Sequence, residues 1–378
     1  MKIGFFSESY KPYVSGVVKS IESFKNQFKE KGHKVYIFAP DYPEARPEDN
    51  VFRIKSFPAL THPDFRLPLT FFNKIRDKIK SLQLDIIHTH SPFLAGWLAK
   101  YVSQKLNIPL VFTYHTLYEK YSHYAPIGKL LAKKITIKYT KKYCEYCDLI
   151  IAPSNYVKKK LQERDILNRI LTVPTGIELS LYENKDTDWI QDKYKIDEEE
   201  KILLFVGRLG KEKNIDFLLK SFQKISNKID NVRLMIVGEG PYKKNLESLR
   251  DNLGIEKKVI FTGLQPYNKV IDFYLYSDLF VFPSLTETQG LVILEAMAGG
   301  LPVVAVDAGG VTAMIDQGEN GILVRENINQ FVRAVVKILS DEKEYRVYCQ
   351  NAVKKAAGYS ISRMADKLLQ GYRDILYL

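Results

Sequence analysis

The sequence predicts an α/β protein of two doubly wound Rossmann-like domains, and three observations predict this fold class. The chain has 378 residues, more than one ordinary hydrophobic core accommodates. Short β-rich apolar runs alternate with helical patterns almost from end to end, which is typical of parallel sheets covered on both faces. The alternation restarts after the charged stretch Glu183–Lys201. Because such folds bind ligands beyond the carboxyl ends of their strands, we expect the active site in the cleft between the domains.

The expected strands are short apolar runs spread along the whole chain. In the first half they are Lys2–Phe6, Lys34–Phe38, Leu84–Thr89, Leu110–Tyr114, Leu149–Ala152 and Ile170–Pro174. In the second half they are Ile202–Val206, Arg233–Val237, Val259–Phe261, Leu279–Phe282, Val303–Val306 and Gly321–Val324. Helical patterns such as Ile215–Ile225, Leu246–Leu253 and Gln330–Leu339 separate them. The expected domains are residues 1–180 and residues 181–361.

Composition and charge narrow the class of protein. The chain is 46% hydrophobic and 26% charged, as in globular proteins, and no apolar run approaches the ~20 residues that span a bilayer. The first residues favour a buried strand over a signal peptide, so we expect a cytoplasmic protein. The net charge is +12, and residues 1–177 hold 29 Lys and Arg against 15 Asp and Glu. This imbalance predicts that the first half meets an anionic partner or surface.

The segment from Pro283 to Gly300 is the most informative part of the chain. It places Glu287 in a loop, then Gly290, then an apolar helix that carries Glu295 eight positions after Glu287. A helix that begins near Gly290 directs its free N–H groups at whatever lies before it, and phosphate is the usual occupant. Two carboxylates beside an anion site suit a ligand with hydroxyl groups attached to phosphate, such as a nucleotide sugar.

With the surrounding Pro-Ser, Gln-Gly-Leu-Val and Glu-Ala-Met-Ala-x-Gly, these glutamates resemble the E-x7-E signature of the retaining nucleotide-sugar glycosyltransferases of family 4, which have the GT-B fold. The resemblance covers nearly the whole chain. It implies that residues 362–378 form a last helix that crosses back to the first domain. It also implies that Glu295 binds the ribose and Glu287 the transferred sugar, while backbone N–H groups of Gly290, Leu291 and Val292 bind the donor diphosphate.

Two cations in the second half suit the same donor. Arg208 and Lys213 lie in Gly207–Asn214, just after the first strand of that half, where cations can converge on phosphates. Fixed positive charges there stabilise a departing diphosphate. Family members show Gly-Arg-Leu…Glu-Lys-Asn at this place, which implies that both side chains bind the diphosphate. No Asp-x-Asp motif lies near a strand end, and we expect no metal ion and no cofactor.

The first half supplies two further candidates. Gly16, in the loop after the first strand, resembles the family glycine that lets backbone approach the donor phosphates, although Ser15-Gly16 replaces the family's Gly-Gly or Gly-Val. His115 lies past a strand end and resembles the family histidine that hydrogen-bonds the donor sugar. His88 and His90 alternate at another strand end without a third metal ligand, so we expect a packing or loop role for both.

The acceptor is indicated by a different segment. Tyr114–Tyr124 is similar to the sub-group that glucosylates diacylglycerol at the membrane surface, as is the Glu-Thr-Gln-Gly form of the signature. The basic stretch that follows adds Lys129, Lys133, Lys134, Lys138, Lys141 and Lys142. Each lysine near an anionic bilayer contributes ~1 kcal/mol of binding. The lysines are mixed with apolar residues around the helix, so a solvated helix face is the alternative.

The sequence therefore predicts a retaining, metal-independent glycosyltransferase that moves glucose from UDP-glucose to a lipid hydroxyl such as diacylglycerol. We expect front-face displacement at the cytoplasmic face of the membrane, with no obligate protein partner and no nucleic acid. One alternative is a family 4 enzyme with a soluble sugar or cyclitol acceptor, using GDP-mannose or a UDP-sugar. Others are a GT-B epimerase or phosphorylase, and a basic nucleic-acid-binding protein, for which no recognisable module is present.

The C-x-x-C formed by Cys144 and Cys147 has no second pair, which favours packing over a metal or redox role.

Overall fold

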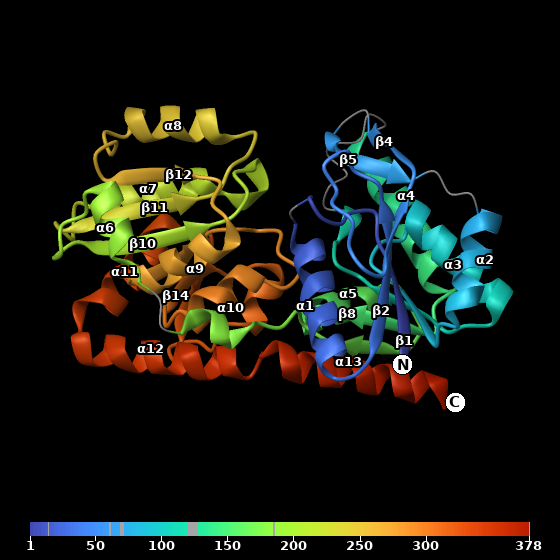
Figure 1. Ribbon diagram of the computed structural model, residues 1–378. Coiled ribbons are helices and arrows are strands. Elements are labelled where there is room, and N and C mark those ends of the chain that lie inside the picture. Colours follow the sequence, from blue (N-terminus) through green and yellow to red (C-terminus); the bar gives the residue numbers. More distant parts are fainter. Residues whose placement is uncertain (14, 60–61, 69–71, 120–127, 184–185, 378) are drawn as a thin grey trace. The chain divides into compact units, whose positions relative to one another are not determined.

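The computed structural model describes residues 1–13, 15–59, 62–68, 72–119, 128–183 and 186–377. The chain divides into two compact units, shown in Figure 1. Unit 1 comprises residues 1–176 and 361–378, and unit 2 comprises residues 177–360. Each unit holds one parallel sheet with helices on its faces, which confirms the predicted class of two doubly wound α/β domains.

Unit 1 is built on a parallel sheet with the strand order β3-β2-β1-β6-β7-β8-β9. Its strands are β1 (Lys2–Phe6), β2 (Lys34–Pro40), β3 (Val51–Ile54), β6 (Ile86–Thr89), β7 (Leu110–Thr113), β8 (Leu149–Ala152) and β9 (Ile170–Thr172). A separate antiparallel pair is formed by β4 (Ser56–Ala59) and β5 (His62–Pro68). Its helices are α1 (Gly16–Glu30), α2 (Phe72–Leu82), α3 (Leu94–Leu106), α4 (Lys129–Cys144), α5 (Asn155–Gln162) and α13 (Ile361–Leu376).

Unit 2 has a parallel sheet with the strand order β12-β11-β10-β13-β14-β15. Its strands are β10 (Lys201–Val206), β11 (Val232–Val237), β12 (Val259–Gly263), β13 (Leu279–Phe282), β14 (Val303–Val306) and β15 (Gly321–Val324). Its α-helices are α6 (Asp188–Tyr194), α7 (Ile215–Ile225), α8 (Lys243–Asn252), α9 (Tyr267–Tyr276), α10 (Leu291–Ala298), α11 (Ile328–Ser340) and α12 (Glu342–Ala357). Short 3-10 turns are η2 (Leu179–Tyr182), η3 (Lys211–Lys213) and η4 (Gly309–Ala313).

The order of strands reverses direction once in each sheet. In unit 1 the reversal lies between β1 and β6, and in unit 2 between β10 and β13. Because neighbouring chain connections leave in opposite directions there, a crevice opens beyond the carboxyl ends of the two central strands. Each unit therefore has one place where its fold favours ligand binding.

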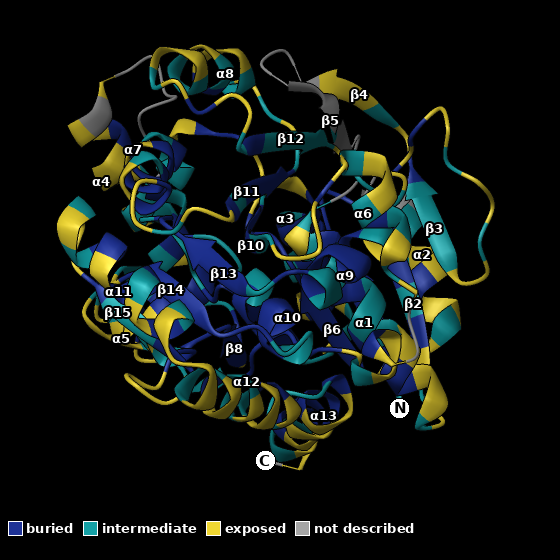
Figure 2. Ribbon diagram, turned by 90° about the vertical axis from the view of Figure 1, so that its left-hand side faces the viewer, coloured by how far each residue is buried: buried dark blue, intermediate teal, exposed yellow. Residues whose placement is uncertain are grey.

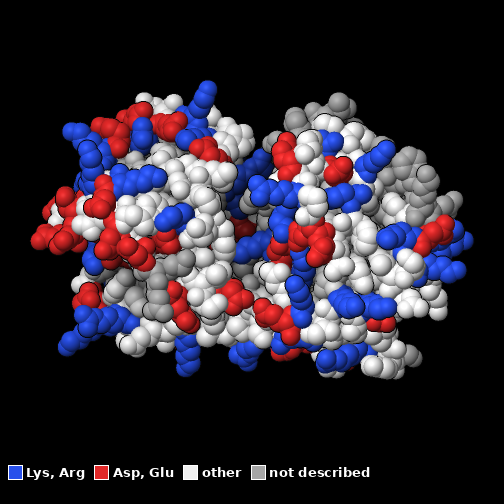
Figure 3. All heavy atoms as spheres, viewed as in Figure 1, with Lys and Arg blue, Asp and Glu red and all other residues white. Residues whose placement is uncertain are grey.

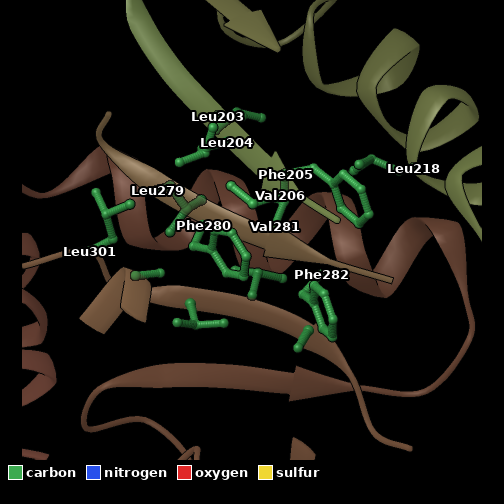
Figure 4. Close-up of a cluster of buried hydrophobic side chains, with 14 of the residues drawn as sticks. Leu203, Leu204, Phe205, Val206, Leu218, Leu279, Phe280, Val281, Phe282 and Leu301 are labelled. Carbon is green, nitrogen blue, oxygen red and sulfur yellow. The ribbon is translucent and has the colours of Figure 1, made fainter. Parts of the chain in front are cut away.

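The core of unit 2 shows why its apolar runs become central strands. Side chains of β10 and β13 point into one cluster, in which Phe205 and Phe282 stack with ring centroids 6.0 Å apart (Figure 4). Leu218 of α7 closes this cluster from the helical side. In Figure 2 the central strands β13 and β14 are buried, whereas α8 has an exposed outer face. Continuous burial of a strand requires helices on both faces, which explains the apolar runs of the sequence.

The two ends of unit 2 lie side by side. Ile177, its first residue, forms a parallel bridge with Ser360, its last, and donates its backbone N–H to Tyr359 at 2.9 Å. After Ser360 the chain enters α13, which packs against α1 of unit 1 and forms a 2.8 Å ion pair between Asp366 and Lys31.

Among the described helices, none is both long and apolar enough to cross a membrane.

Candidate active site

The strand reversal of unit 2 brings four of the sequence-predicted residues to one edge of its sheet. Arg208 and Lys213 follow the carboxyl end of β10, and Glu287 and Gly290 follow the carboxyl end of the adjacent strand β13. The sequence separates these two loops by about 75 residues, and only the topology of the sheet unites them. This edge is where a doubly wound sheet binds ligands.

Glu287 and Lys213 contact each other across the two loops. The Lys213 ammonium donates to Glu287 Oε1, and the two side chains are only 20% and 17% exposed. Ser284 Oγ donates to the same carboxylate oxygen at 3.0 Å. The Arg208 side chain is exposed and has no hydrogen bond or ion pair within the described ranges. The site thus combines a held ammonium–carboxylate pair with a guanidinium that is available to an anion.

The loop that carries Glu287 rests on two glycines that sequence reasoning missed. Gly310 donates its backbone N–H to the Glu287 carbonyl at 2.9 Å. A Cβ on Gly309 would stand 2.5 Å from that carbonyl oxygen, and a Cβ on Gly310 would stand 2.2 Å from the carbonyl oxygen of Thr288. Gly309 also has a positive φ of 64°. The adjacent glycines after β14 were the available signal, because backbone this close excludes any side chain.

The helix α10 begins as predicted, at Leu291, with Gly290 in the left-handed region (φ 79°) as its N-cap. The N-cap residue is a glycine and so has no side chain with which to cap this end of the helix. As first residues of a helix, Leu291 and Val292 have backbone N–H groups without intrahelical acceptors. The resulting positive end of α10 faces the loop that carries Glu287 and favours an anion there.

Glu295 occupies the second turn of α10 and is 4% exposed. Two tyrosines of α9 hold its carboxylate: Tyr274 donates to Oε2 at 2.9 Å, and Tyr267 donates to Oε1 at 3.3 Å. Tyr274 is fully buried. These partners were missed from the sequence, because their spacing on α9 is that of ordinary core residues. They fix the orientation of Glu295 before any ligand binds.

In unit 1, the loops at the strand reversal carry Gly16 and Glu8. Gly16 is the first residue of α1, after Ser15, whose Oγ accepts the Val18 N–H at 3.3 Å. Among the described residues, nothing lies within 4 Å of the position that a Cβ on Gly16 would occupy, so none of these neighbours within unit 1 requires glycine here. Glu8 is 3% exposed and accepts the Ala95 N–H at the start of α3 at 2.7 Å. Burial raises the pKa of Glu8 to about 8.

His115 lies just beyond β7, beside His90, which lies just beyond β6. The Nε2 atom of His115 is 2.9 Å from Nδ1 of His90. Burial lowers the pKa of His115 to about 4 and holds the pKa values of His88 and His90 well below their usual range. The expected packing role of His88 agrees with its burial, but His90 in addition contacts the candidate site residue.

The segment that resembles the diacylglycerol sub-group is held by a buried ion pair. Arg164 pairs with Glu119, which is 7% exposed, and its guanidinium also lies 3.3 Å from the Tyr114 hydroxyl. Tyr118 packs edge-on against Phe93 at 5.2 Å. The remaining residues of this motif, 120–124, lie outside the described residues. The described part therefore has a fixed conformation beside His115.

The basic helix α4 exposes apolar as well as charged side chains. Its exposed apolar residues are Leu130, Leu131 and Ile135, which are 78%, 55% and 50% exposed. Its exposed lysines include Lys133, Lys134 and Lys138. On the face shown in Figure 3, basic and acidic side chains are interspersed over both units. The mixed composition of the helix agrees with the sequence pattern, and exposure of three large aliphatic side chains is unusual for a purely solvated face.

The described residues contain no group of three or more His, Cys, Asp or Glu side chains that could hold a metal ion. Cys144 and Cys147 are buried free thiols, and burial raises the pKa of Cys144 to about 12. Their burial agrees with the expected packing role.

Two family descriptions match the chain: Glycosyltransferase Family 4 over residues 14–181, and Glycosyl transferases group 1 over residues 186–356. The alpha-monoglucosyldiacylglycerol synthase of Acholeplasma laidlawii is 31% identical over 392 residues, which cover 100% of this chain and 98% of that enzyme. The enzyme of the same name from Streptococcus pneumoniae is 36% identical over 312 residues, 81% of this chain and 71% of that enzyme.

Solved structures with a similar fold include the sucrose-phosphate synthase of Thermosynechococcus elongatus, with a TM-score of 0.79 and 21% identity over 100% of this chain and 99% of that chain. Anabaena HepE in complex with UDP has a TM-score of 0.78 and 19% identity over 99% of this chain and 100% of that chain. These two similarities concern the fold.

Proposed function

Because the chain belongs to glycosyltransferase family 4 and has the GT-B fold, we propose that it transfers glucose from UDP-glucose, with retention, to diacylglycerol at a membrane surface. That it is a hexosyltransferase follows from the family. The proposal for the donor and the acceptor draws on the two relatives named as monoglucosyldiacylglycerol synthases. The single observation that carries it is the Lys213–Glu287 ion pair, which joins the loop after β10, where Arg208 also lies, to the loop that leads into α10.

In this proposal the diphosphate binds at the carboxyl end of β10. Arg208 and Lys213 neutralise its charge, and backbone N–H groups of Gly290, Leu291 and Val292 at the start of α10 donate to its oxygens. Fixed donors of this kind gain strength as negative charge develops on the leaving diphosphate, and losing one typically costs ~3 kcal/mol of barrier. Gly16 leaves room for the same phosphates at the start of α1. These groups supply the positive charge that a metal ion supplies in other enzymes.

The sugar nucleotide is oriented by carboxylates and by a histidine. Glu295, held by two tyrosine hydroxyls, accepts hydrogen bonds from the ribose. Glu287 and His115 contact the transferred hexose. The acceptor hydroxyl attacks from the face that the diphosphate leaves, and a phosphate oxygen takes its proton. Because the acceptor enters on the face that the diphosphate leaves, the configuration at the anomeric carbon is retained, and no side chain acts as a nucleophile.

For the acceptor, we propose that α4 contacts an anionic bilayer. Insertion of its exposed aliphatic side chains would remove apolar area from water at about 25 cal/mol per Å². The neighbouring lysines would each add ~1 kcal/mol near anionic lipid. Leu131→Ser with Ile135→Ser should weaken sedimentation with anionic vesicles while leaving UDP binding unchanged. Equal sedimentation of this variant and the parent protein would remove α4 from the proposal.

The test of the reaction is transfer of a radiolabelled sugar. UDP-glucose, UDP-galactose and GDP-mannose are each offered with and without anionic vesicles that contain diacylglycerol. We expect label in the lipid phase from UDP-glucose with vesicles, and an α-linked product by NMR. Transfer to a soluble sugar without vesicles would favour the alternative acceptor class, and transfer from GDP-mannose would overturn the donor.

Single substitutions test the donor site in the same assay. Glu287→Ala, Arg208→Ala and Lys213→Ala should each lower turnover by about two orders of magnitude or more. Lys211→Ala is the matched control, because Lys211 is an exposed lysine in the same turn η3. If the Arg208 or Lys213 variants retained the activity of the control, the assignment of the diphosphate site would be wrong.

A further inference from the structure

A row of apolar side chains follows one side of the helix α4 in unit 1. Leu131, Ile135 and Tyr139 recur at intervals of four residues, which places them on neighbouring turns of the same side. Leu131 and Ile135 are 55% and 50% exposed. From the first to the last of the three, the row extends about 12 Å along the helix axis.

The row continues from α4 onto the loop before α3. The Phe93 ring stacks on the Tyr139 ring, with centroids 5.8 Å apart and an interplanar angle of 15°. The Tyr139 hydroxyl donates to the Pro92 carbonyl at 2.9 Å, which fixes the helix to the loop. Phe93 and the next residue, Leu94, are 40% and 39% exposed. Five side chains thus form what we name the apolar strip: Leu131, Ile135, Tyr139, Phe93 and Leu94.

One end of the apolar strip lies close to the polar residues of the strand reversal in unit 1. Phe93 follows His90 by three residues, and His90 contacts His115. Leu94 begins α3, whose first turn donates a backbone N–H to Glu8 at 2.7 Å. The strip therefore leads from the exposed surface of α4 to groups that bind hydroxyls and other polar atoms. This order of apolar and polar groups matches an amphiphile.

The charge beside the apolar strip indicates what surrounds it. α4 contains six lysines and neither Asp nor Glu. Lys134 and Lys138 lie three residues after Leu131 and Ile135, on adjoining helix surface, and both are exposed. Neither has an ion pair within the described residues. Cations without partners beside aliphatic side chains suit an anionic lipid surface.

The size of the apolar strip argues against a folded protein as its occupant. A stable protein interface has about 20–30 residues on each side, whereas the strip has five. On α4 it takes one residue from each turn, so it is narrow and long. A single hydrocarbon chain fits this shape, and each methylene that it removes from water strengthens binding by up to about fourfold.

We propose that the apolar strip binds one acyl chain of the lipid acceptor, with the hydroxyl end of the lipid at the strand reversal of unit 1. The identity of the acceptor belongs to the proposed function, on which this part of the inference rests. Binding of the chain does not depend on transfer. Leu131 and Ile135 meet the bilayer, and Phe93 and Leu94 contact the part of the chain that has left it.

The first experiment detects the acyl chain without a reaction. Protein with ¹³C-labelled leucine and isoleucine methyl groups is titrated in NMR with dioctanoylglycerol, dissolved below the concentration at which it aggregates. We expect the methyl signals of Leu94 and Ile135 to shift. Leu167 is the internal control, because it is 94% exposed in unit 1 outside the strip. Glycerol, which lacks acyl chains, should shift none of the three.

Two results of this titration would overturn the proposal. One is a set of Leu94 and Ile135 signals that dioctanoylglycerol leaves unchanged. The other is a shift of the same signals with protein concentration alone, because the strip would then be an interface between two copies of the chain.

Chain-length selectivity then separates binding of an acyl chain from docking to a bilayer. The ratio of kcat/KM for dioctanoylglycerol to kcat/KM for dihexanoylglycerol is measured without vesicles, both lipids being dissolved as monomers. Leu94→Ser should lower this ratio by up to about fourfold for each methylene that loses its contact. Leu94→Met, which keeps an apolar side chain, and Leu167→Ser should retain the ratio of the parent protein. Thermal unfolding of each variant is the control for folding.

The two experiments distinguish failure of this inference from failure of the proposed function. An equal ratio in Leu94→Ser and Leu167→Ser would mean that the strip holds no acyl chain, and the proposal would be wrong even though diacylglycerol is the acceptor. If dioctanoylglycerol shifts the Leu94 and Ile135 signals but receives no sugar from any donor, the strip stands and the proposed acceptor falls.

Discussion

Replacement of Glu8 by glutamine tests the electrostatics of unit 1. The carboxyl lies at the start of α3, where the N-cap residue Phe93 makes no side-chain cap, and where the helix end and the Ala95 N–H favour the ionised form of Glu8. Desolvation opposes ionisation and is the larger effect, so the pKa rises from 4.5 to about 8. The folded protein therefore keeps a proton on Glu8 at neutral pH that the unfolded chain releases.

The sign of the pH dependence follows from this difference in bound protons. The favourable contribution of the protonated Glu8 is complete below pH 4.5 and is lost as the pH rises toward 8. Between those values the loss is about 1.4 kcal/mol per pH unit. From pH 5.5 to 7.5, the wild-type carboxyl should lose roughly 2–3 kcal/mol of unfolding free energy relative to Glu8→Gln, which cannot ionise.

Urea unfolding at these two pH values measures the difference. The chain has two tryptophans, Trp97 in unit 1 and Trp189 in unit 2. In a Trp189→Phe background, fluorescence therefore reports unit 1 alone. The buried histidines titrate alike in both proteins, so they cancel when Glu8→Gln is compared with its parent. A stability difference that stays constant from pH 5.5 to 7.5 would show that Glu8 is already ionised in the folded state, and the burial argument would be wrong.

Two further predictions concern unit 2, and a third concerns the cysteines of both units. Gly310→Ala should displace the Thr288 backbone, which a Cβ would approach to 2.2 Å, and should lower transfer activity about tenfold or more in the radiolabel assay; unchanged activity would contradict the close contact. Tyr274→Phe removes a hydroxyl from the buried Glu295 carboxylate, and should weaken UDP affinity in calorimetry by about 1–3 kcal/mol; an unaltered affinity would separate this carboxylate from the ribose. Titration with a thiol reagent should modify only Cys349 in the native protein and all three cysteines in urea, since the other two are buried.

Much of the fold could be predicted from the sequence, because buried parallel strands leave continuous apolar runs. Lys2–Phe6, Leu149–Ala152 and Leu279–Phe282 are strands at the predicted residues. Other strand ends shift by a few residues, since the register with the neighbouring strand decides where pairing stops. The edge strand β3 and the β4–β5 pair were missed. The β4–β5 segment contains three prolines and lacks the alternation or apolar run that indicates a strand.

The candidate site, like the fold, could be predicted from the sequence only in part. Glu287, Arg208 and Lys213 could be selected because each stands in a loop just after a strand. The contact between Lys213 and Glu287 could not be foreseen without the strand order. The groups that orient the site left no local signal: Tyr274 lies 21 residues from Glu295, and His90 lies 25 residues from His115. Such partners belong to the packing of the sheet, and their sequence context is that of ordinary core residues.

The adjacent ends of unit 2 have a consequence for biosynthesis. Unit 1 is assembled from two separate stretches of chain, and the second, α13, emerges from the ribosome only after all of unit 2. During translation the nascent unit 1 leaves exposed the surface of α1 that α13 covers, and His88 lacks its Tyr372 partner. Unit 2, in contrast, is continuous and can fold as soon as its last strand and helices emerge. The unit that is made first is therefore completed last.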